Sequence, residues 1–434
     1  MMTFTSATDR PFRRIGIVTL LLSALLAMAS LSGCERDFSP IVPEFDASES
    51  KLKGARTITD DEIGVMEGVY TVEEGSAMFG QEVVLRWSDR SPSIFCRTNG
   101  AFFILIGGAK NDSVIFEGYW RNAYNLQTGK ARLTIAPDDG GRDIVKGKPV
   151  AAPIIMRGVI GHEGAAASTP VTLRFNRPLP VDTLKDFFIL GHRGGGRNSD
   201  FHPFSENSLE MLRFAHRLGC NGVEIDIQLT ADDVPILFHD LNFSTRLVKG
   251  DHMVGPVVNY TYQQINRFTT LVNGERVPTL EEALKTIDQE TSIRFVWVDV
   301  KTAETIPKVV PIIRKALKDA ENRKVPLEIV IGLWTQQTYD AYTALPPEDR
   351  LPALSELSTD LTSAIDADVW APRWTLGLQT DEVARMHAEG RRAFVWTLDQ
   401  EFAIEDFLYD GDYDGILTNY PTVVAWYYYT RGGA

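Results

Sequence analysis

The stretch GVEIDIQLTADDVPILFHD at residues 222–240 decides how the second half of the chain folds. Glu224 and Asp226 stand two residues apart in a β-rich run, so both side chains leave the same face of one strand. A turn is expected next, and a second β-rich run ends at His239. The gap between the runs is too short for a parallel crossover, so the second run should return antiparallel. A register centred on the turn places His239 opposite Glu224, and the three side chains would then form a patch for a hard cation and a proton-transfer group.

Strands and helices alternate from residue 187 onwards. We predict strands at residues 187–190, 223–229, 294–300, 327–333, 351–357, 368–371, 393–398 and 415–417. Helices are predicted at residues 207–218, 279–288, 306–319, 336–345, 380–388 and 401–408, and a closing helix should begin at Pro421. Eight strands in a segment of this length match a (β/α)8 TIM barrel at residues 187–434, with the run at 234–238 as an extra return strand. A doubly wound open sheet is the alternative.

The chain before this barrel changes character twice. Residues 61–180 are predicted to form a smaller all-β domain, either a sandwich or a small barrel. Its predicted strands are at residues 68–72, 82–87, 101–106, 113–120, 131–135 and 171–175. No catalytic constellation is found in this segment, so we expect a spacer, a lid or a surface for a protein partner that stays unknown. Residues 34–60 are polar and without periodicity, and we interpret them as a tether.

The first 34 residues have the pattern of an export signal. Three arginines within residues 10–14 precede an apolar run at residues 15–31, as in a secretory signal peptide. The run ends in LSGC at residues 31–34, which resembles the lipobox of bacterial lipoproteins. The resemblance implies cleavage of residues 1–33 and lipidation of Cys34, and an uncleaved membrane anchor is the alternative. Either way, we expect the rest of the chain to be held at a membrane of the bacterial cell envelope, facing the periplasm or the exterior.

The composition excludes some classes of partner. The chain has 434 residues, 44% of them hydrophobic, which is enough for two or three packed domains. Its formal net charge is −14, and the loss of residues 1–33 would make it −16. Such a charge argues against a nucleic-acid partner and against electrostatic adhesion to anionic lipid. Cys96 and Cys220 fall in different predicted domains, so we expect no disulfide framework.

Further polar residues gather where predicted barrel strands end, which is where barrel active sites form. His192 and Arg193 follow the first strand, and Asp299 and Lys301 stand two residues apart at the third. Each pair alone is also typical of a loop, a solvated face or a structural ion pair. Together with the residues of the 222–240 stretch, however, they would all lie at one end of one barrel.

An ordered set of motifs runs through residues 187–430. It comprises HRG at 192–194, EN at 206–207, ExD at 224–226, LTxDxxP at 229–235, HD at 239–240, VPTLEEAL at 277–284 and DGILTNYP at 414–421. This set resembles the glycerophosphodiester phosphodiesterase family. The resemblance implies a TIM-barrel enzyme that hydrolyses glycerophosphodiesters to sn-glycerol 3-phosphate and an alcohol. It also implies that a glycerol hydroxyl of the substrate attacks phosphorus and that a cyclic phosphate is then hydrolysed.

The resemblance also implies roles for individual residues. The ligands of a divalent cation would be Glu224, Asp226 and, in place of the usual Glu-x-Lys, Asp299. An all-oxygen ligand set favours Mg²⁺ or Ca²⁺ over zinc. His192 and His239 would be the general acid and base. Arg193 and Lys301 would contact the phosphate. Glu206 and Asn207 would support these groups.

Four positions depart from the family pattern or stand beside it. Asp299 is one methylene shorter than the usual glutamate, so the cation would sit differently or bind through water. Ser205 replaces a usual proline, and Asn419 stands where an aspartate is common. His202 lies in the long connection to Glu206, where we expect an ordinary histidine in a flexible loop.

Two other functions fit parts of the sequence. One is a phospholipase D-like or sugar-phosphodiester-cleaving relative with the same barrel. The other is a non-catalytic lipoprotein binding module in which the all-β domain does the work. A degenerate barrel of that kind should have lost proton-transfer or metal residues, yet both histidines and all three acids are present.

Overall fold

A computed structural model describes residues 42–163, 165–180, 187–250 and 252–431. The predicted signal peptide and Cys34 lie outside these residues. Among the helices of the described residues, none combines the length and the apolar character that a membrane crossing requires.

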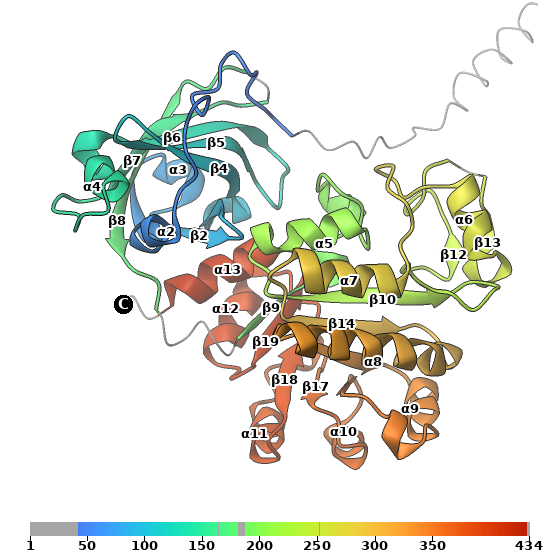
Figure 1. Cartoon of the computed structure of the whole chain (residues 1–434). Coiled ribbons are helices and arrows are strands. Elements are labelled where there is room, and N and C mark those ends of the chain that lie inside the picture. Colours follow the sequence, from blue (N-terminus) through green and yellow to red (C-terminus); the bar gives the residue numbers. More distant parts are fainter. Residues whose placement is uncertain (1–41, 164, 181–186, 251, 432–434) are drawn as a thin grey trace, which may run out of the picture. The chain divides into compact units, whose positions relative to one another are not determined.

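The C-terminal part contains a closed barrel of parallel strands, as predicted (Figure 1). Its eight strands are β9 (Phe188–Gly191), β10 (Gly222–Leu229), β14 (Phe295–Val300), β15 (Glu328–Leu333), β16 (Ala353–Ser355), β17 (Val369–Trp370), β18 (Arg392–Val395) and β19 (Gly415–Thr418). Strand β9 pairs in parallel with both β10 and β19, which closes the sheet. The open-sheet alternative is therefore wrong.

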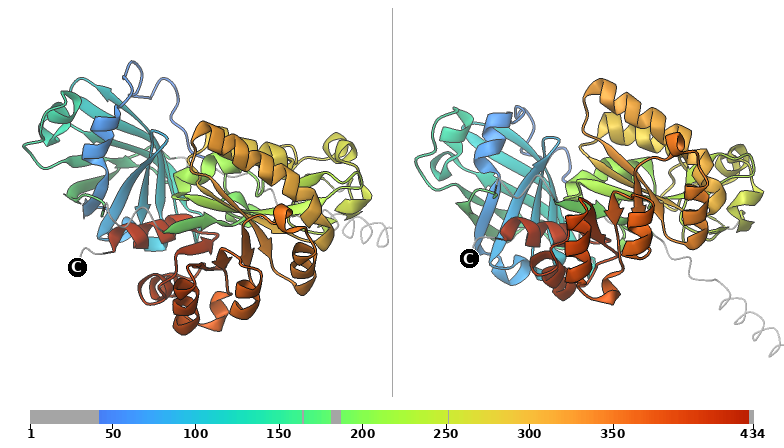
Figure 2. Two further views of the ribbon diagram at one scale, coloured as in Figure 1. Left: turned by 60° about the horizontal axis from the view of Figure 1, so that its bottom comes forward. Right: turned by 90° about the horizontal axis from the view of Figure 1, so that it is seen from below.

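Helices follow most of these strands, and α7 and α8 run alongside β10 and β14 (Figures 1 and 2). The helices of this part are α5 (Leu209–Ala215), α6 (Tyr262–Phe268), α7 (Leu280–Glu290), α8 (Ile306–Arg323), α9 (Gln336–Thr343), α10 (Thr359–Ala364), α11 (Thr380–Ala388), α12 (Glu401–Tyr409) and α13 (Pro421–Thr430). The sequence did not predict α6 and α10. Both are too short, at seven and six residues, to show a clear helical period.

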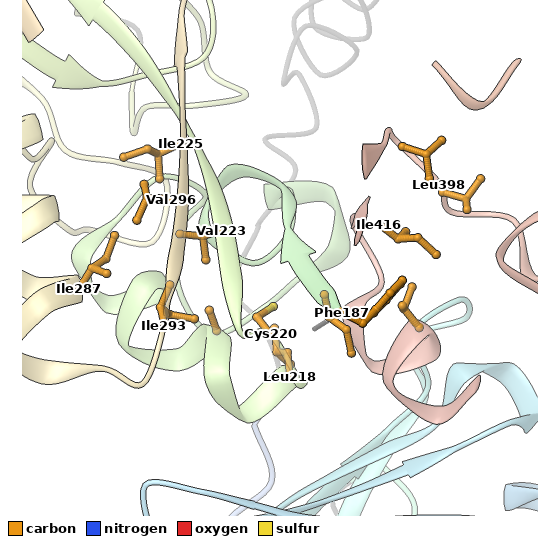
Figure 3. Close-up of a cluster of buried hydrophobic side chains, with 14 of the residues drawn as sticks. Phe187, Leu218, Cys220, Val223, Ile225, Ile287, Ile293, Val296, Leu398 and Ile416 are labelled. Carbon is orange, nitrogen blue, oxygen red and sulfur yellow. The ribbon is translucent and has the colours of Figure 1, made fainter. Parts of the chain in front are cut away.

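Side chains alternate across the wall of the barrel. Val223 and Ile225 of β10 pack outside with Val296 of β14 and Ile287 of α7 (Figure 3). The intervening positions face inward, where Phe295 and its neighbours form a separate apolar core. Glu224 and Asp226 occupy inward positions of β10, so the period-two pattern aims both carboxylates into the barrel.

The return arm runs antiparallel to β10, as predicted, but in a different register. Strand β11 (Pro235–Leu237) pairs Leu237 with Ile227 and Pro235 with Leu229. The connection is centred on Asp232, one half-residue later than we expected, so His239 falls opposite Ile225 rather than Glu224. The turn explains the shift. Thr230 Oγ1 accepts a hydrogen bond from the Val234 amide at 3.0 Å, and the turn that this bond closes contains residues 231–233, an odd number. Beyond the arm, β12 (Asn242–Phe243) and β13 (Gly255–Pro256) form a short antiparallel pair.

The segment before the TIM barrel is a closed antiparallel barrel rather than a sandwich. Its strands are β1 (Gly68–Glu74), β2 (Glu82–Ser88), β3 (Ser91–Cys96), β4 (Phe102–Lys110), β5 (Ser113–Arg121), β6 (Thr128–Ile135), β7 (Ile155–Ile160) and β8 (Thr169–Arg177), and short helices are α2 (Asp60–Met66), α3 (Ser76–Phe79) and α4 (Gly141–Val145). The sequence missed β3, which contains a proline, and β7, which contains a glycine. Both residue types weaken a strand signal.

Part of the predicted tether belongs to this antiparallel barrel, which corrects the boundary at residue 60. Ser50 Oγ donates to Glu117 at 2.6 Å, and Ile58 is buried in the core of the barrel. Arg56 forms a bridge with Ala109 of β4. Local polarity concealed these contacts because they are made with residues more than fifty positions away.

Side chains of both barrels share one apolar cluster. Phe95 and Phe102 of the antiparallel barrel belong to the same cluster as Leu218 and Val423. Arg121 Nη2 also donates to the Asp200 carbonyl at 2.8 Å. The two cysteines of the described residues, Cys96 and Cys220, are both free and buried.

Candidate active site

A cavity of 1090 Å³ opens at the C-terminal ends of the parallel strands. The structure brings the predicted site residues to its wall or directly behind it. His192, Arg193, Glu224, His239, Asp299 and Lys301 line it. Asp226 is buried beside them and pairs with Asp299 in the β10–β14 ladder. Their roles stay predictions, but their proximity is a property of the fold.

Three carboxylates form the centre of this site. One oxygen each of Glu224, Asp226 and Asp299 lies within 4.8 Å of the others. Glu224 Oε1 and Asp299 Oδ1 are buried and have no hydrogen-bond partner among the described residues. Buried acceptors without donors are costly unless a cation neutralises them. The all-oxygen donor set therefore fits a hard divalent cation.

Lys301 is the cation that this chain itself supplies to the cluster. Its Nζ lies 2.5 Å from Asp226 Oδ1 and also pairs with Asp299. Burial alone would lower the pKa of Lys301, but the carboxylates of Asp226, Asp299 and Glu224 raise it well above its usual value. One ammonium faces three carboxyl groups, so a further cation would be needed for all three to ionise.

The three carboxyl groups differ in the direction in which their pKa values are shifted. Burial, with Asp226 as the next cause, raises the pKa of Glu224 well above its usual range. Burial also raises the pKa of Asp299. It opposes ionisation of Asp226 as well, but Lys301 and the neighbouring His239 and Arg193 hold that pKa below its usual value. The surroundings thus favour the anion of Asp226 and disfavour the anions of Glu224 and Asp299 unless a cation lies nearby.

His192 is held by a chain of hydrogen bonds from the last strand. Asn419 Nδ2 donates to Asp399 Oδ2 at 2.6 Å, which leaves Asn419 Oδ1 to face His192 Nδ1 at 2.8 Å. An amide oxygen can only accept, so His192 carries its proton on Nδ1 and presents a lone pair at Nε2. Burial, followed by the charge of Arg193, lowers the pKa of His192 to about 3.

His239 is oriented by a carboxylate. Its Nδ1 lies 2.7 Å from Asp240 Oδ1, and Arg246 Nη2 lies 2.7 Å from the same oxygen. Arg193 Nη2 lies 2.9 Å from His239 Nε2. A guanidinium can only donate, so Nε2 is the lone-pair nitrogen here as well. Both imidazoles thus line the shared cavity with the lone pair on Nε2, and the lone pair of His239 accepts from Arg193.

Arg193 and Asn207 stand in left-handed backbone conformations beside the carboxylates. Arg193 has a φ of 54°, and its amide donates to Glu224 Oε2 at 2.8 Å, while its Nη1 contacts Glu206 Oε1 at 2.8 Å. Asn207 has a φ of 57°, and its Nδ2 donates to Asp226 Oδ2 at 2.7 Å. Non-glycine residues adopt this conformation at a cost, and such strain gathers at functional sites.

The structure accounts for two of the departures and corrects one expectation. Ser205 is buried, and its Oγ donates to Glu275 Oε2 at 2.6 Å, a bond that a proline could not make. Asn419 supplies the acceptor for His192. His202 lies in the connection between β9 and α5, where it is buried near Phe214, and it does not line the cavity.

Sequence reasoning missed the far wall of the cavity and the residues that orient the histidines. The wall residues follow β15 to β18, and they are Trp334, Glu356, Arg373 and Trp396. The rule that pointed to the first three strands, polar residues at strand ends, would have found them too. Asn419 was noticed only as a departure from the family pattern, and Asp399 had no local signal, because His192 is more than two hundred residues away.

Comparisons with known proteins agree with this geometry. The model of the glycerophosphoryl diester phosphodiesterase family matches residues 192–423. A glycerophosphodiester phosphodiesterase of Bacillus altitudinis is 25% identical over 246 residues, which cover 54% of this chain and 94% of that protein. Glycerophosphodiester phosphodiesterase 1 of Mus musculus is 36% identical over 131 residues, or 26% of this chain and 37% of the mouse protein.

Among solved structures, a glycerophosphodiester phosphodiesterase from Parabacteroides distasonis has a TM-score of 0.45 and 22% identity, covering 57% of this chain and 98% of its own. The family match spans more than half of the sequence and contains both histidines and all three acids of the cavity. The chain therefore belongs to the glycerophosphoryl diester phosphodiesterase family, and its activity is that of a glycerophosphodiester phosphodiesterase.

Proposed function

We propose that the chain hydrolyses glycerophosphodiesters to sn-glycerol 3-phosphate and an alcohol, and that it needs a divalent cation, Mg²⁺ or Ca²⁺, to do so. The observation that supports metal dependence is the buried cluster of Glu224, Asp226 and Asp299, with two carboxylate oxygens lacking donors among the described residues. These three residues would hold the cation. When bound, it would neutralise charge on the phosphodiester and polarise the P–O bond.

The remaining groups of the site would bind and orient the substrate. Arg193 and Lys301 carry positive charge at the cavity wall and would face the phosphate oxygens. Attack of a substrate glycerol hydroxyl on phosphorus would break the bond to the alcohol and form a cyclic phosphate, which water then opens. One imidazole of the pair His192 and His239 would take the proton of the attacking hydroxyl at its Nε2. The other would have to be protonated at Nε2 beforehand, and it would then give that proton to the departing alkoxide.

The test is a product assay with and without metal. Purified protein should release sn-glycerol 3-phosphate from glycerophosphoethanolamine, lose this activity after treatment with EDTA, and regain it when Mg²⁺ or Ca²⁺ is added. Activity that persists at full rate after exhaustive chelation would overturn the metal site. A failure to cleave any glycerophosphodiester would overturn the choice of substrate.

We also propose that the enzyme is lipid-anchored in the bacterial cell envelope through Cys34. The support is the basic and apolar sequence of residues 10–31 followed by LSGC. In cells fed a labelled fatty acid, the wild-type chain should carry the label in the membrane fraction, and Cys34→Ala should not. Equal labelling of both would reject this anchor.

A further inference from the structure

The cavity has a second half that the proposed reaction does not use. The acidic cluster and both histidines come from the β9, β10 and β14 side of the barrel, whereas Trp334, Glu356, Arg373 and Trp396 follow β15 to β18. The cavity has a volume of 1090 Å³, whereas roughly 300–1,000 Å³ is enough for a ligand of drug size. Glycerol phosphate is smaller than such a ligand, so it would fill only a fraction of the cavity. The second half thus has room for the alcohol part of the substrate.

Two indole rings are fixed in this half by hydrogen bonds to the backbone. Trp334 Nε1 donates to the Val300 carbonyl at 2.9 Å, and Trp396 Nε1 donates to the Ala371 carbonyl at 2.9 Å. With their N–H groups occupied, the rings offer the cavity apolar surface rather than donors. Trp334 remains 41% exposed, although a large aromatic side chain is usually more buried than that.

Two polar groups accompany the rings, a guanidinium and a carboxyl group. The Arg373 guanidinium lies 4.9 Å from the centre of the Trp396 ring. Glu356 is partly buried and lines the cavity, and its carboxylate makes no hydrogen bond or ion pair with any described residue. The Arg373 guanidinium, the Glu356 carboxyl group and the two indole rings therefore line the same space. Arg373 and Glu356 do not form a hydrogen bond with each other.

We infer that this half of the cavity, built by Trp334, Glu356, Arg373 and Trp396, is a subsite for a polyhydroxylated leaving alcohol such as an inositol or a sugar. The inference rests on the proposed function. Neighbouring hydroxyls of such a ring both donate and accept, so they can bond Glu356 and Arg373 together. The C–H face of the ring can pack on an indole.

A quaternary ammonium head group fits this half less well. Binding such a cation needs open aromatic faces and no competing charge. Here the Arg373 guanidinium already lies over Trp396 and would repel a second cation at that ring, although Glu356 would attract one. A neutral polyol, by contrast, can use the acceptor of Glu356 and the donors of Arg373 at the same time.

The experiment compares kcat/KM for glycerophosphoinositol and glycerophosphoethanolamine, using the full chain with its metal. The wild-type ratio should favour the inositol substrate by about tenfold or more, and Glu356→Gln and Trp334→Ala should each lower that ratio by about tenfold. Glu304→Gln is the matched control, because Glu304 is an exposed acid that also lines the cavity. It should leave the ratio unchanged.

Each other outcome is decisive. A wild-type preference for ethanolamine or choline substrates, or equal losses on both substrates in the two variants, would overturn the polyol subsite while leaving the proposed function intact. Hydrolysis of no glycerophosphodiester at all would instead overturn the proposed function, and the subsite with it.

Discussion

Single residues in the site are set by partners that constrain what each can do. His192 and His239 have different neighbours, an amide and a carboxylate, yet both keep a lone pair at Nε2. In each case the partner of Nδ1 fixes the tautomer, because one ring nitrogen of a neutral imidazole carries the proton and the other keeps a lone pair, which in His239 accepts from Arg193. Proton transfer at this site should therefore depend on the second residue of each pair as well as on the histidine.

Removal of either imidazole should nearly abolish turnover. General acid–base catalysis contributes about 10²–10⁴-fold to a rate, so His192→Ala and His239→Ala should each lower kcat by about that factor. Steady-state kinetics measures the loss, and circular dichroism with thermal melting checks that the variants stay folded. A folded variant with wild-type kcat would remove that histidine from the mechanism.

Asp399 should act on His192 without touching the substrate. It accepts both the backbone amide and the Nδ2 of Asn419. In Asp399→Asn, the Asn419 amide is free to turn its Nδ2 toward His192 and to impose the other tautomer. We expect kcat to fall by about tenfold or more, as for other groups that orient a reacting side chain.

The ¹⁵N chemical shifts of the His192 ring distinguish this effect from general destabilisation, because they report which nitrogen carries the proton. Asp410→Asn, an exposed aspartate of the same part of the chain, is the control. Reduced activity with an unchanged His192 tautomer would contradict the proposed orienting role.

At the scale of elements, the register of β10 against β14 creates the acidic cluster. The parallel ladder pairs Asp226 with Asp299 and Glu224 with Trp297, so acids that are more than seventy residues apart become neighbours. A shift of one residue in either strand would turn its acids to the outer face. The helices behind these strands hold this register through the apolar cluster of Figure 3.

Helix α7 belongs to this support, and its first turn is held by a capping box. Thr279 accepts the Glu282 amide, and Glu282 accepts the Thr279 amide. Thr279→Ala should lower the free energy of unfolding by about 1 kcal/mol, because it leaves a helix-terminal amide unsatisfied. Thr380→Ala is the control, since Thr380 begins α11 without acting as its cap. Urea unfolding should separate the two variants, and equal midpoints would contradict the capping role.

For the molecule as a whole, the sequence predicted the TIM barrel better than the antiparallel barrel. A strand in which inward-facing and outward-facing residues alternate produces a strong periodic signal, as at 222–229. A helix of ten or more residues does so too, as at 306–323. Strand β3 carries a proline and β7 a glycine, and their pairing depends on neighbours distant in sequence. Such contacts have no local signature, which is also why residues 50–58 were expected to be a tether.

The buried His202 makes stability depend on pH. Burial, with Arg121 opposing and Asp200 favouring the proton, lowers the pKa of His202 to about 4. Because the folded pKa lies below the unfolded value of about 6.5, the unfolded chain binds the proton more readily, and stability present above pH 6.5 is lost as the pH falls toward 4. The loss attributable to this group is at most about 3 kcal/mol.

His202→Gln should therefore flatten the decline in unfolding free energy between pH 6.5 and 4, measured by urea titration at several pH values. The exposed His162→Gln serves as control. Parallel curves for the wild type and His202→Gln would show that His202 is not kept neutral by the fold.

The sequence by itself determined the order of the eight strands of the TIM barrel, the shared face of Glu224 and Asp226, and the identity of the charged and proton-carrying residues. These follow from side-chain alternation along a strand and from motif spacing, which are local properties. Only the tertiary structure decided the one-residue register of the return arm, the Asp399–Asn419–His192 chain and the wall that contains Glu356 and Trp334. Those features depend on closure of the barrel. Closure brings strand ends and loops together in space, and their separation along the chain does not reveal how close they become.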